Sequence, residues 1–174
     1  MNSEKTVGYI LTIMLVAFVL LAFLRGCYAA EPSKTPSLDN YNKKELDCLT
    51  EAVYFEARSE TFSGQIAVAQ VIMNRVRHPF FPSTICKVTK QGVYKNGKPV
   101  KYLCAFSYWC DGKPERMVNT EAFARAVSAA VLVLEGVRID ILRKALYYHA
   151  SYVKPKWSKD RKKLASIGNH IFYR

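Results

Sequence analysis

The stretch EAVYFEARSETFSGQIAVAQVIMNRV, residues 51–76, predicts two apolar helices in quick succession, and the rest of the fold has to pack around them. The stripe of the first helix, at helical spacing, consists of Leu46, Leu49, Ala52 and Val53. The same spacing leads next to Glu56, so a carboxyl group lies on the apolar face of its own helix. Glu51 falls beside that stripe, and Glu60 lies beyond the helix in a turn.

A carboxyl group in that position has a chemical consequence. Burial disfavours the ionised form and raises the pKa, so Glu56 is expected to keep its proton close to neutral pH. A proton held in this way is what a general acid needs in order to protonate the leaving oxygen of a glycosidic bond. The alternative is structural: Glu56 pairs with Arg58 or Arg75 and has no chemical role.

Capping residues set the bounds of the first two helices. Asn42, with Glu45 three residues later, resembles a capping box and starts the first helix. Ser63 is the predicted N-cap of the second helix, which runs to about Arg77. That helix is apolar nearly all round, so it should be central. Its narrow polar stripe consists of Gln70, Asn74 and Arg77.

The remaining segments complete a mainly α fold of the α+β class. A third helix begins at Asn119 or Thr120 and ends at Gly136. Residues 93–102, VYKNGKPVKY, hold Asn-Gly between short β-branched and aromatic runs and predict a small β-hairpin. The aromatic and basic tail, residues 145–174, has few helical signals.

The first 30 residues form a separate targeting segment. The uncharged run Val7–Leu24 is 18 residues long, at the border between a signal-peptide core and a short membrane span. Cleavage after Ala29 gives a signal peptide, and retention gives a signal-anchor. Cys27 stands in a loose lipoprotein-like box, although Arg25 does not fit that box. In each case the remainder of the chain is exported, to the periplasm or cell envelope.

Composition changes after this segment. Residues 31–41 carry two prolines and read as a linker, which leaves residues 42–174 as one domain with a real core. The chain has 26 Lys and Arg against 14 Asp and Glu, a formal charge of +12. Such an excess indicates a polyanionic partner, namely a nucleic acid, an anionic membrane or an acidic wall polymer, unless it serves solubility alone.

Export also affects the expected state of the cysteines, because disulfides form in exported proteins. Four remain in the domain, Cys48, Cys86, Cys104 and Cys110, and an even number in an exported domain favours two disulfides. Four cysteines allow three pairings, and the sequence does not choose among them. The spacings between the cysteines lack the short CxxC pairs of structural zinc sites, so disulfides are favoured over a zinc site.

Other chemistry finds little support in the sequence. Asp111 is the best candidate for a second catalytic carboxylate, although turn preferences favour a plain Asp-Gly turn residue. His149 lies among tyrosines without an HExxH motif or other metal spacing, so no metal is expected. No GxSxG motif and no glycine-rich phosphate loop occur, and no cofactor is expected.

Aromatic residues in irregular segments, where sugar rings could stack, are Tyr108, Trp109, Tyr148 and Trp157.

Several separated motifs occur in an order that resembles the cell wall hydrolase family typified by spore-cortex-lytic enzymes. They are CLTEAVYFEARSETFSGQIAVAQVIMNRVRHPFFPSTICKV, then FSYWCDG, then YYHASYVKPKW and finally IGNHIFYR. The resemblance covers residues 44–174. It implies a compact, mostly helical fold related to lysozyme-like lytic transglycosylases.

The resemblance also implies an activity. Members cleave peptidoglycan between N-acetylmuramic acid and N-acetylglucosamine, and many leave a 1,6-anhydro-muramoyl end. The catalytic acid and base is the glutamate of EAR, which is Glu56 here, and one carboxyl group suffices. The residues expected to bind the substrate are Ser107, Tyr108, Trp109, Tyr148, His149 and Trp157.

This chain departs from the family pattern at four positions: Ser59 replaces Gly, Ala105 stands where Gln often precedes FS, and Leu146 and Tyr147 replace Thr-His. The last three touch the expected cleft, so substrate preference is open.

Two alternative functions remain: a muramidase that uses water and Asp111, and a wall-binding protein without activity. A nucleic-acid binder has only charge in its favour, and no nucleic-acid partner is expected.

Overall fold

The computed structural model of the protein describes Met14 and residues 42–174. The predicted targeting segment, apart from Met14, and the predicted linker lie outside the described residues. Within the part that is described, no helix combines the length and apolar character needed to cross a membrane. The elements in chain order are α2 (Lys43–Ala57), α3 (Phe62–Val76), α4 (Ile85–Thr89), β1 (Gly92–Lys95), β2 (Lys98–Cys104), η2 (Ser107–Cys110), α5 (Thr120–Leu134), η3 (Asp140–Leu142), β3 (Tyr147–Ala150), η4 (Lys156–Asp160), β4 (Lys163–Ile167) and β5 (His170–Tyr173).

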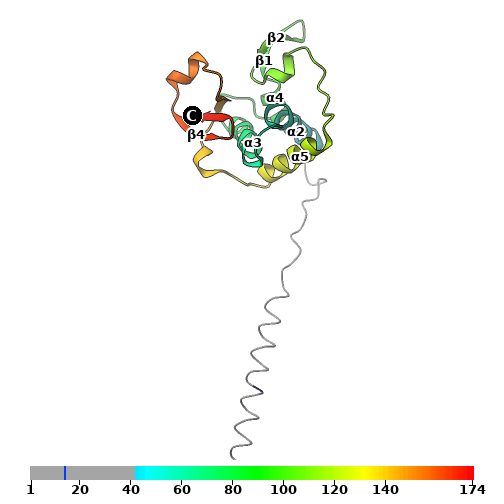
Figure 1. Ribbon diagram of the computed structural model, residues 1–174. Helices are drawn as coiled ribbons and strands as arrows, with labels where there is room; N and C mark the ends of the chain where they lie inside the picture. The colour runs from blue at the N-terminus through cyan, green and yellow to red at the C-terminus, as the bar shows by residue number, and fades with distance from the viewer. Residues whose placement is uncertain (1–13, 15–41) are drawn as a thin grey trace, which may run out of the picture. The chain divides into compact units, whose positions relative to one another are not determined.

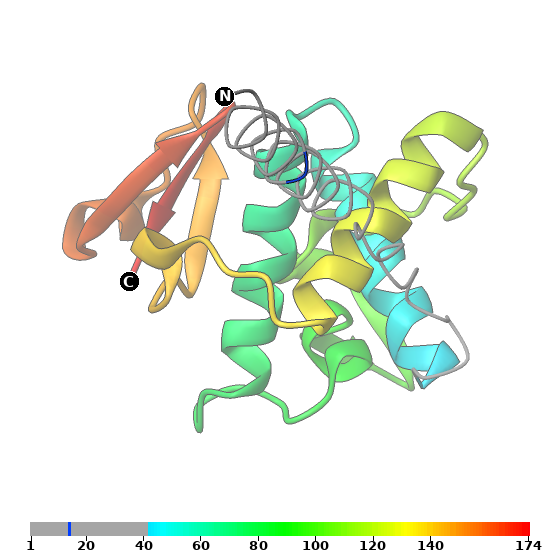
Figure 2. The same ribbon diagram turned by 90° about the horizontal axis from the view of Figure 1, so that it is seen from below.

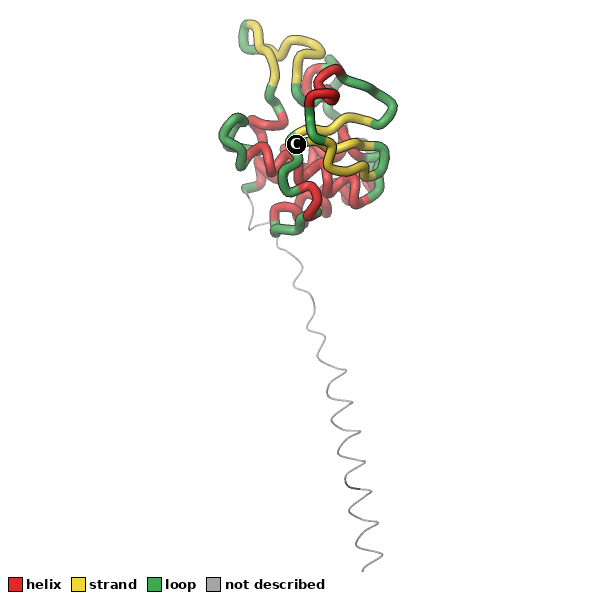
Figure 3. Tube along the Cα trace, turned by 90° about the vertical axis from the view of Figure 1, so that its left-hand side faces the viewer, coloured by secondary structure: helices red, strands yellow, loops and turns green. Residues whose placement is uncertain are grey.

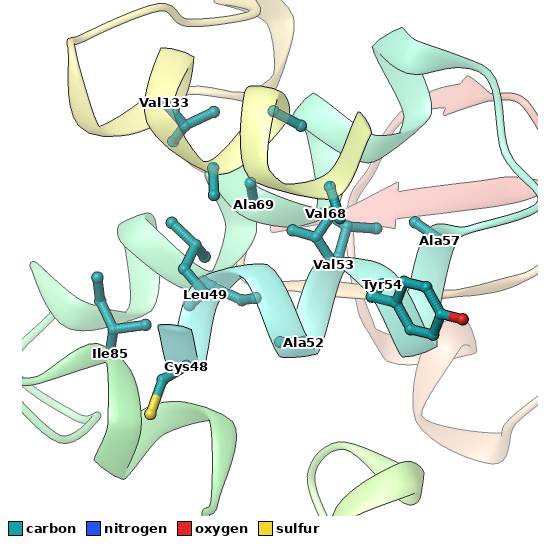
Figure 4. Packing of buried hydrophobic residues seen from close by; sticks show 14 of the residues in the cluster. Cys48, Leu49, Ala52, Val53, Tyr54, Ala57, Val68, Ala69, Ile85 and Val133 are labelled. Carbon is teal, nitrogen blue, oxygen red and sulfur yellow. The ribbon is translucent and has the colours of Figure 1, made fainter. Parts of the chain in front are cut away.

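Helix α3 is central, as its apolar circumference predicts. On one side it packs against α2 and α5, and on the other against a small sheet (Figures 1 and 2). Val68, Ala69 and Ile72 face the helical side, where they join the main core with residues of α2 such as Leu49 and Val53 (Figure 4). Ala67 and Val71 face the sheet and form a second cluster whose other members are Leu142, Ala145 and Phe172.

The polar stripe of α3 fastens the segment that links α5 to the sheet. Gln70 and the backbone of Ile139 exchange two hydrogen bonds, of 3.1 and 2.7 Å. The Asn74 amide donates to the carbonyls of Leu142 and Ala145, both at 2.9 Å. These bonds satisfy backbone groups that would otherwise lie unpaired beside the core. Two of the three stripe residues are therefore structural.

Most of the predicted helix ends are confirmed. Asn42 caps α2, and Asn119 caps α5 by accepting a hydrogen bond from the amide of Ala122 at 2.8 Å. The predicted N-cap of α3 was wrong. Thr61, not Ser63, accepts the capping bond from Gly64 at 3.2 Å, and Ser63 is already inside the helix.

Two antiparallel sheets accompany the helices. Strands β1 and β2 form the predicted hairpin around Asn96 and Gly97, both with positive φ, and Figure 3 shows it projecting from the helical body. The tail contains a second sheet that the sequence reading missed, in the order β3-β5-β4. The α+β class is confirmed, with more strand than one hairpin provides.

Both predicted disulfides are present in the structure. Cys48 of α2 is bonded to Cys86 of α4, and Cys104 at the end of β2 is bonded to Cys110 in η2. The α2–α4 contact has a second fastening: the Glu45 carboxylate accepts hydrogen bonds from the amides of Ile85 and Cys86, at 2.6 and 3.3 Å. That carboxylate caps the start of α4 and does not complete a capping box within α2.

One turn of the second sheet favours glycine. Gly168 has φ +56°, and a Cβ there would lie 2.1 Å from Oε2 of Glu60, which accepts a hydrogen bond from the amide of Asn169 at 2.8 Å. Relieving that clash moves the carboxylate and breaks its bond. We expect Gly168→Ala to lower the free energy of unfolding by about 3 kcal/mol, measured by urea denaturation.

The matched control is Gly97→Ala. Gly97 has φ +75° with nothing within 4 Å of an added Cβ, so only the left-handed backbone is penalised, by about 1 kcal/mol. Equal losses at the two positions would contradict a role for Glu60 in fastening this turn.

Candidate active site

A groove of about 660 Å³ is lined mainly by three segments that are distant in sequence. They are the C-terminal end of α2, residues 104–115 around η2, and β3 with the turn that follows it, and Arg75 of α3 and His170 of β5 complete the lining. The charged residues that line the groove include three acids and three bases: Glu56, Asp111, Glu115, Arg58, Arg75 and Lys113.

Glu56 lies in the last turn of α2 and lines this groove. Burial raises its pKa, as the apolar stripe predicts. Three weaker influences favour the carboxylate and lower the pKa: a hydrogen bond from the Tyr148 hydroxyl to Oε2 at 3.0 Å, the charge of Arg75 and the backbone of Ser107. Burial outweighs them, so the pKa of Glu56 is raised on balance, which is the direction that a general acid requires.

The alternative reading, an ion pair between Glu56 and an arginine, is not what the structure contains. Among the described residues, the ion pairs within 4.0 Å involve neither Glu56 nor its two candidate partners. Arg58 is placed over the ring of Tyr54, with 5.6 Å between the guanidinium carbon and the ring centroid. Arg75 lies among aromatic rings, with its guanidinium carbon 5.1 Å from the centroid of the Phe106 ring, and its charge lowers the pKa of Glu56.

Tyr148 reaches Glu56 from β3. Its neighbours on the sheet are Phe172, directly opposite in β5, and His170, and both rings contact the tyrosine ring. Burial, and then the neighbouring charge of Glu56, raise the pKa of Tyr148 well above its ordinary value. The hydroxyl therefore remains a hydrogen-bond donor, which fixes one carboxyl oxygen of Glu56.

Another part of the groove lining comes from η2. Ser107 is exposed at its start, and Tyr108 follows as a buried ring stacked on Phe55, with 5.1 Å between the centroids. Burial raises the pKa of Tyr108, and so do the nearby charges of Glu51 and Glu56. Both residues line the groove, as expected of substrate-binding residues.

The other predicted binding residues lie in different places. His149 lines the groove, with Nε2 2.9 Å from the hydroxyl of Tyr173. Trp157 lines a neighbouring hollow instead. Trp109 lines neither: its Nε1 donates to the hydroxyl of Tyr94 at 2.9 Å, and Lys90 lies 4.0 Å from its ring centroid. The indole therefore supports the hairpin.

The groove lining also includes Arg75, Glu115 and His170, which the sequence did not mark as site residues; Arg75 was considered only as an ion-pair partner of Glu56. Arg75 sits one position from the polar stripe of α3, and Glu115 lies in a stretch without periodicity, so neither had a pattern to mark it. Asp111 is in the groove, where its carboxylate accepts a hydrogen bond from the amide of Lys113 at 2.8 Å. Among the described residues no cluster of three His, Cys, Asp or Glu side chains could hold a metal ion.

Comparison with known families gives this groove a context. A sequence model described as Cell Wall Hydrolase matches residues 59–173. The chain belongs to the cell wall hydrolase family. The matched range starts three residues after Glu56, so that carboxyl group is placed by the groove and not by the family match. The resemblance noted in the sequence is confirmed.

Curated relatives of this cell wall hydrolase are spore cortex-lytic enzymes. That of Bacillus subtilis (strain 168) is 30% identical over 134 residues, 76% of this chain and 38% of the relative. That of Oceanobacillus iheyensis is 32% identical over 142 residues, 79% of this chain and 45% of the relative. The chain thus aligns with less than half the length of either relative.

Solved structures of the family resemble the domain more completely. The catalytic domain of the germination-specific lytic transglycosylase SleB from Bacillus anthracis is 30% identical, with a TM-score of 0.60. The match covers 80% of this chain and 100% of that domain. For the catalytic domain of Bacillus cereus SleB the identity is 26% and the TM-score 0.56, over 84% of this chain and 100% of the domain. The mostly helical α+β fold of this cell wall hydrolase is therefore that of SleB catalytic domains.

Proposed function

We propose that this cell wall hydrolase cleaves the glycan strand of peptidoglycan between N-acetylmuramic acid and N-acetylglucosamine. We infer that it acts as a lytic transglycosylase, which leaves 1,6-anhydro-muramoyl ends. One observation carries the proposal: Glu56, with a raised pKa and a fixed carboxyl oxygen, lines a groove in a domain that resembles the whole SleB catalytic domain.

The reaction needs a single carboxyl group. Protonated Glu56 donates its proton to the glycosidic oxygen, and the bond from that oxygen to C1 of the muramoyl residue breaks. The resulting carboxylate takes the proton of the muramoyl C6 hydroxyl while that oxygen bonds to C1. Glu56 is protonated again at the end, and no water is consumed.

Hydrolysis is the second candidate because Asp111 and Glu115 line the same groove. Either carboxylate could act as the base that activates a water molecule. A wall-binding protein without activity is the third candidate, and the raised pKa of Glu56 argues against it, because a buried acid without a function is a cost to the fold.

The targeting segment and the charge suit the proposed substrate. We propose that residues 1–30 are a signal peptide or a signal-anchor and that residues 31–41 link them to the domain. Export places the domain at the cell envelope, and a formal charge of +12 favours contact with an anionic wall.

The test is a digest of purified peptidoglycan with the full chain, read by mass spectrometry. Anhydro-muramoyl ends are expected. Reducing muramic ends would overturn the transglycosylase step and favour water activation by Asp111 or Glu115. Glycan strands left intact by folded protein with both disulfides formed would overturn cleavage altogether.

Tyr148→Phe is expected to move the pH dependence of cleavage. The hydrogen bond from Tyr148 lowers the pKa of Glu56, so its loss raises that pKa further. The acid then keeps its proton to a higher pH, and the alkaline limb of the rate profile shifts upward. We also expect the maximal rate to fall about tenfold because the carboxyl group is less well oriented.

The matched control for Tyr148→Phe is Tyr102→Phe, an exposed tyrosine of the hairpin, which should leave the profile in place. An unchanged alkaline limb of the pH–rate profile in Tyr148→Phe would show that this hydroxyl does not act on the catalytic acid.

A further inference from the structure

A second hollow of about 520 Å³ adjoins the groove. The two share Arg75, Ala105 and Tyr148, so the side chains around the Glu56–Tyr148 contact also border the second space. Its other walls come from the hairpin, through Val93 and Leu103, and from aromatic rings. The rings are those of Phe81, Tyr147 and Trp157.

The charges of this hollow are unbalanced. Arg75 and Arg161 line it, and no Asp or Glu does, in contrast to the groove. No ion pair within 4.0 Å among the described residues involves either arginine. Two guanidinium groups without an ion-pair partner form a site to which a carboxylate could bind.

Arg75 is only 8% exposed, yet its guanidinium is incompletely bonded. Nε donates to the carbonyl of Leu146 at 2.7 Å, whereas Nη1 is buried without a hydrogen-bond partner. The rings of Phe81, Phe106 and Tyr147 surround the group, with centroids 5.1–5.8 Å from the guanidinium carbon. Rings hold a cation in place but leave its N–H groups unsatisfied, and an unpaired buried donor indicates a missing acceptor.

Arg161 shows the same deficit beside the ring of Tyr147. Its guanidinium carbon lies 3.4 Å from the Tyr147 ring centroid and 5.8 Å from that of Trp157. Its Nε is also buried without a partner. The two cations are near enough to affect each other: burial lowers the pKa of Arg75, and the charge of Arg161 lowers it further.

We propose that this hollow, the arginine pocket (Arg75, Arg161, Tyr147 and Trp157), binds a carboxylate of the peptide stem carried by the muramoyl residue. The inference rests on the proposed function, which puts that residue in the adjoining groove. Two departures from the family pattern, Ala105 and Tyr147, line the pocket, so a difference in substrate preference is expected here. The aromatic walls suit the aliphatic parts of a peptide, and the arginines suit its acid.

Binding tests the arginine pocket without relying on catalysis. The full chain carrying Glu56→Gln is titrated by calorimetry with an N-acetylglucosaminyl–N-acetylmuramoyl tripeptide, and with the same muropeptide after amidation of its carboxylates. We expect about tenfold weaker binding of the amidated form. Adding Arg161→Gln should weaken binding of the free acid to the same extent and abolish the difference between the two ligands.

Arg143→Gln, added to Glu56→Gln in the same way, is the matched control, because Arg143 is exposed and pairs with Asp140 at the surface. It should leave both affinities unchanged. Equal binding of the free and amidated ligands to the protein with both arginines would overturn the proposal, and this arm does not depend on the folding of an arginine variant. A loss in Arg143→Gln equal to that in Arg161→Gln would also overturn it, because general charge would then explain the effect.

Failure of this inference can be told apart from failure of the proposed function. Cleavage of peptidoglycan with indifference to the carboxylates overturns only the arginine pocket. Carboxylate-dependent binding without any cleavage by the chain that retains Glu56 overturns only the catalytic proposal.

Discussion

Glu56→Gln is expected to lower the rate of peptidoglycan cleavage by about 10²–10⁴-fold, the usual contribution of a general acid. The amide keeps the shape of the side chain and can still contact Tyr148, but it has no acidic proton for the leaving oxygen. Substrate binding should change little, so the loss should appear in the turnover number and not in KM. Release of soluble glycan fragments from purified peptidoglycan measures both constants.

Glu51→Gln is the matched control in the same helix. Burial also raises the pKa of Glu51, but its carboxyl group does not line the groove. The rate should therefore stay within a few-fold of that of the unaltered protein. A Glu56→Gln protein that still cleaves at the normal rate would transfer the acid role to Asp111 or Glu115.

Glu56→Gln, which should lower the cleavage rate, should raise the stability of the fold. Because the pKa of Glu56 is higher in the fold than in the unfolded chain, ionisation opposes folding. The stability that protonated Glu56 contributes is fully present below its ordinary pKa of 4.5 and is lost as pH rises through the folded pKa. We expect Glu56→Gln to raise Tm at pH 8 and to leave it nearly unchanged at pH 4, so that activity and stability trade against each other at this position.

The sequence predicted the helices because their signals are local. Apolar periodicity and a capping residue within one turn suffice to place α2 and α5, and Asn42 and Asn119 cap them as expected. The start of α3 was misplaced because Thr61 and Ser63 are both good N-caps. The choice depends on which hydroxyl reaches the backbone amide of Gly64, and this is a matter of geometry and not of residue type.

The tail sheet had no comparable signal. Its strands are four or five residues long, too short for an alternation of apolar and polar residues to show. They are held by distant partners: β5 packs on α3 through Phe172, and the turn before β5 is fastened by Glu60 from the α2–α3 connection. Contacts of this kind become visible only when the chain is folded.

Some residues of the site could be predicted from local signals in the sequence, and others could not. Glu56 could be predicted because one helix carries both the carboxyl group and the apolar stripe that buries it. Arg75 could not, because what makes it notable is the set of rings around it, Phe81, Phe106 and Tyr147, which come from three separate segments. Trp109 is the opposite case: it lies in a motif that indicates substrate binding, but its indole donates a hydrogen bond to Tyr94 of the hairpin and does not line the groove.

Removal of the Cys48–Cys86 disulfide, by alanine at both positions, should lower the free energy of unfolding by about 4 kcal/mol. The bond closes a loop with a sequence separation of 38, and the entropy that a cross-link removes from the unfolded chain grows with loop length. The same change at Cys104 and Cys110, with a separation of only 6, should cost about 2 kcal/mol. Denaturant unfolding of the two variants measures the difference.

The two variants should rank differently in activity. Cys104 lines the groove, and its bond holds η2, which carries Ser107 and Tyr108, against the end of β2. Loss of this bond loosens the part of the groove that η2 forms. We therefore expect the smaller loss of stability to come with the larger loss of cleavage rate, under conditions where both variants are folded. Cys48 and Cys86 lie outside the groove lining, between α2 and α4. Activities that simply follow the two stabilities would show that η2 holds its place without the cross-link, and the short disulfide would then have no separate part in shaping the site.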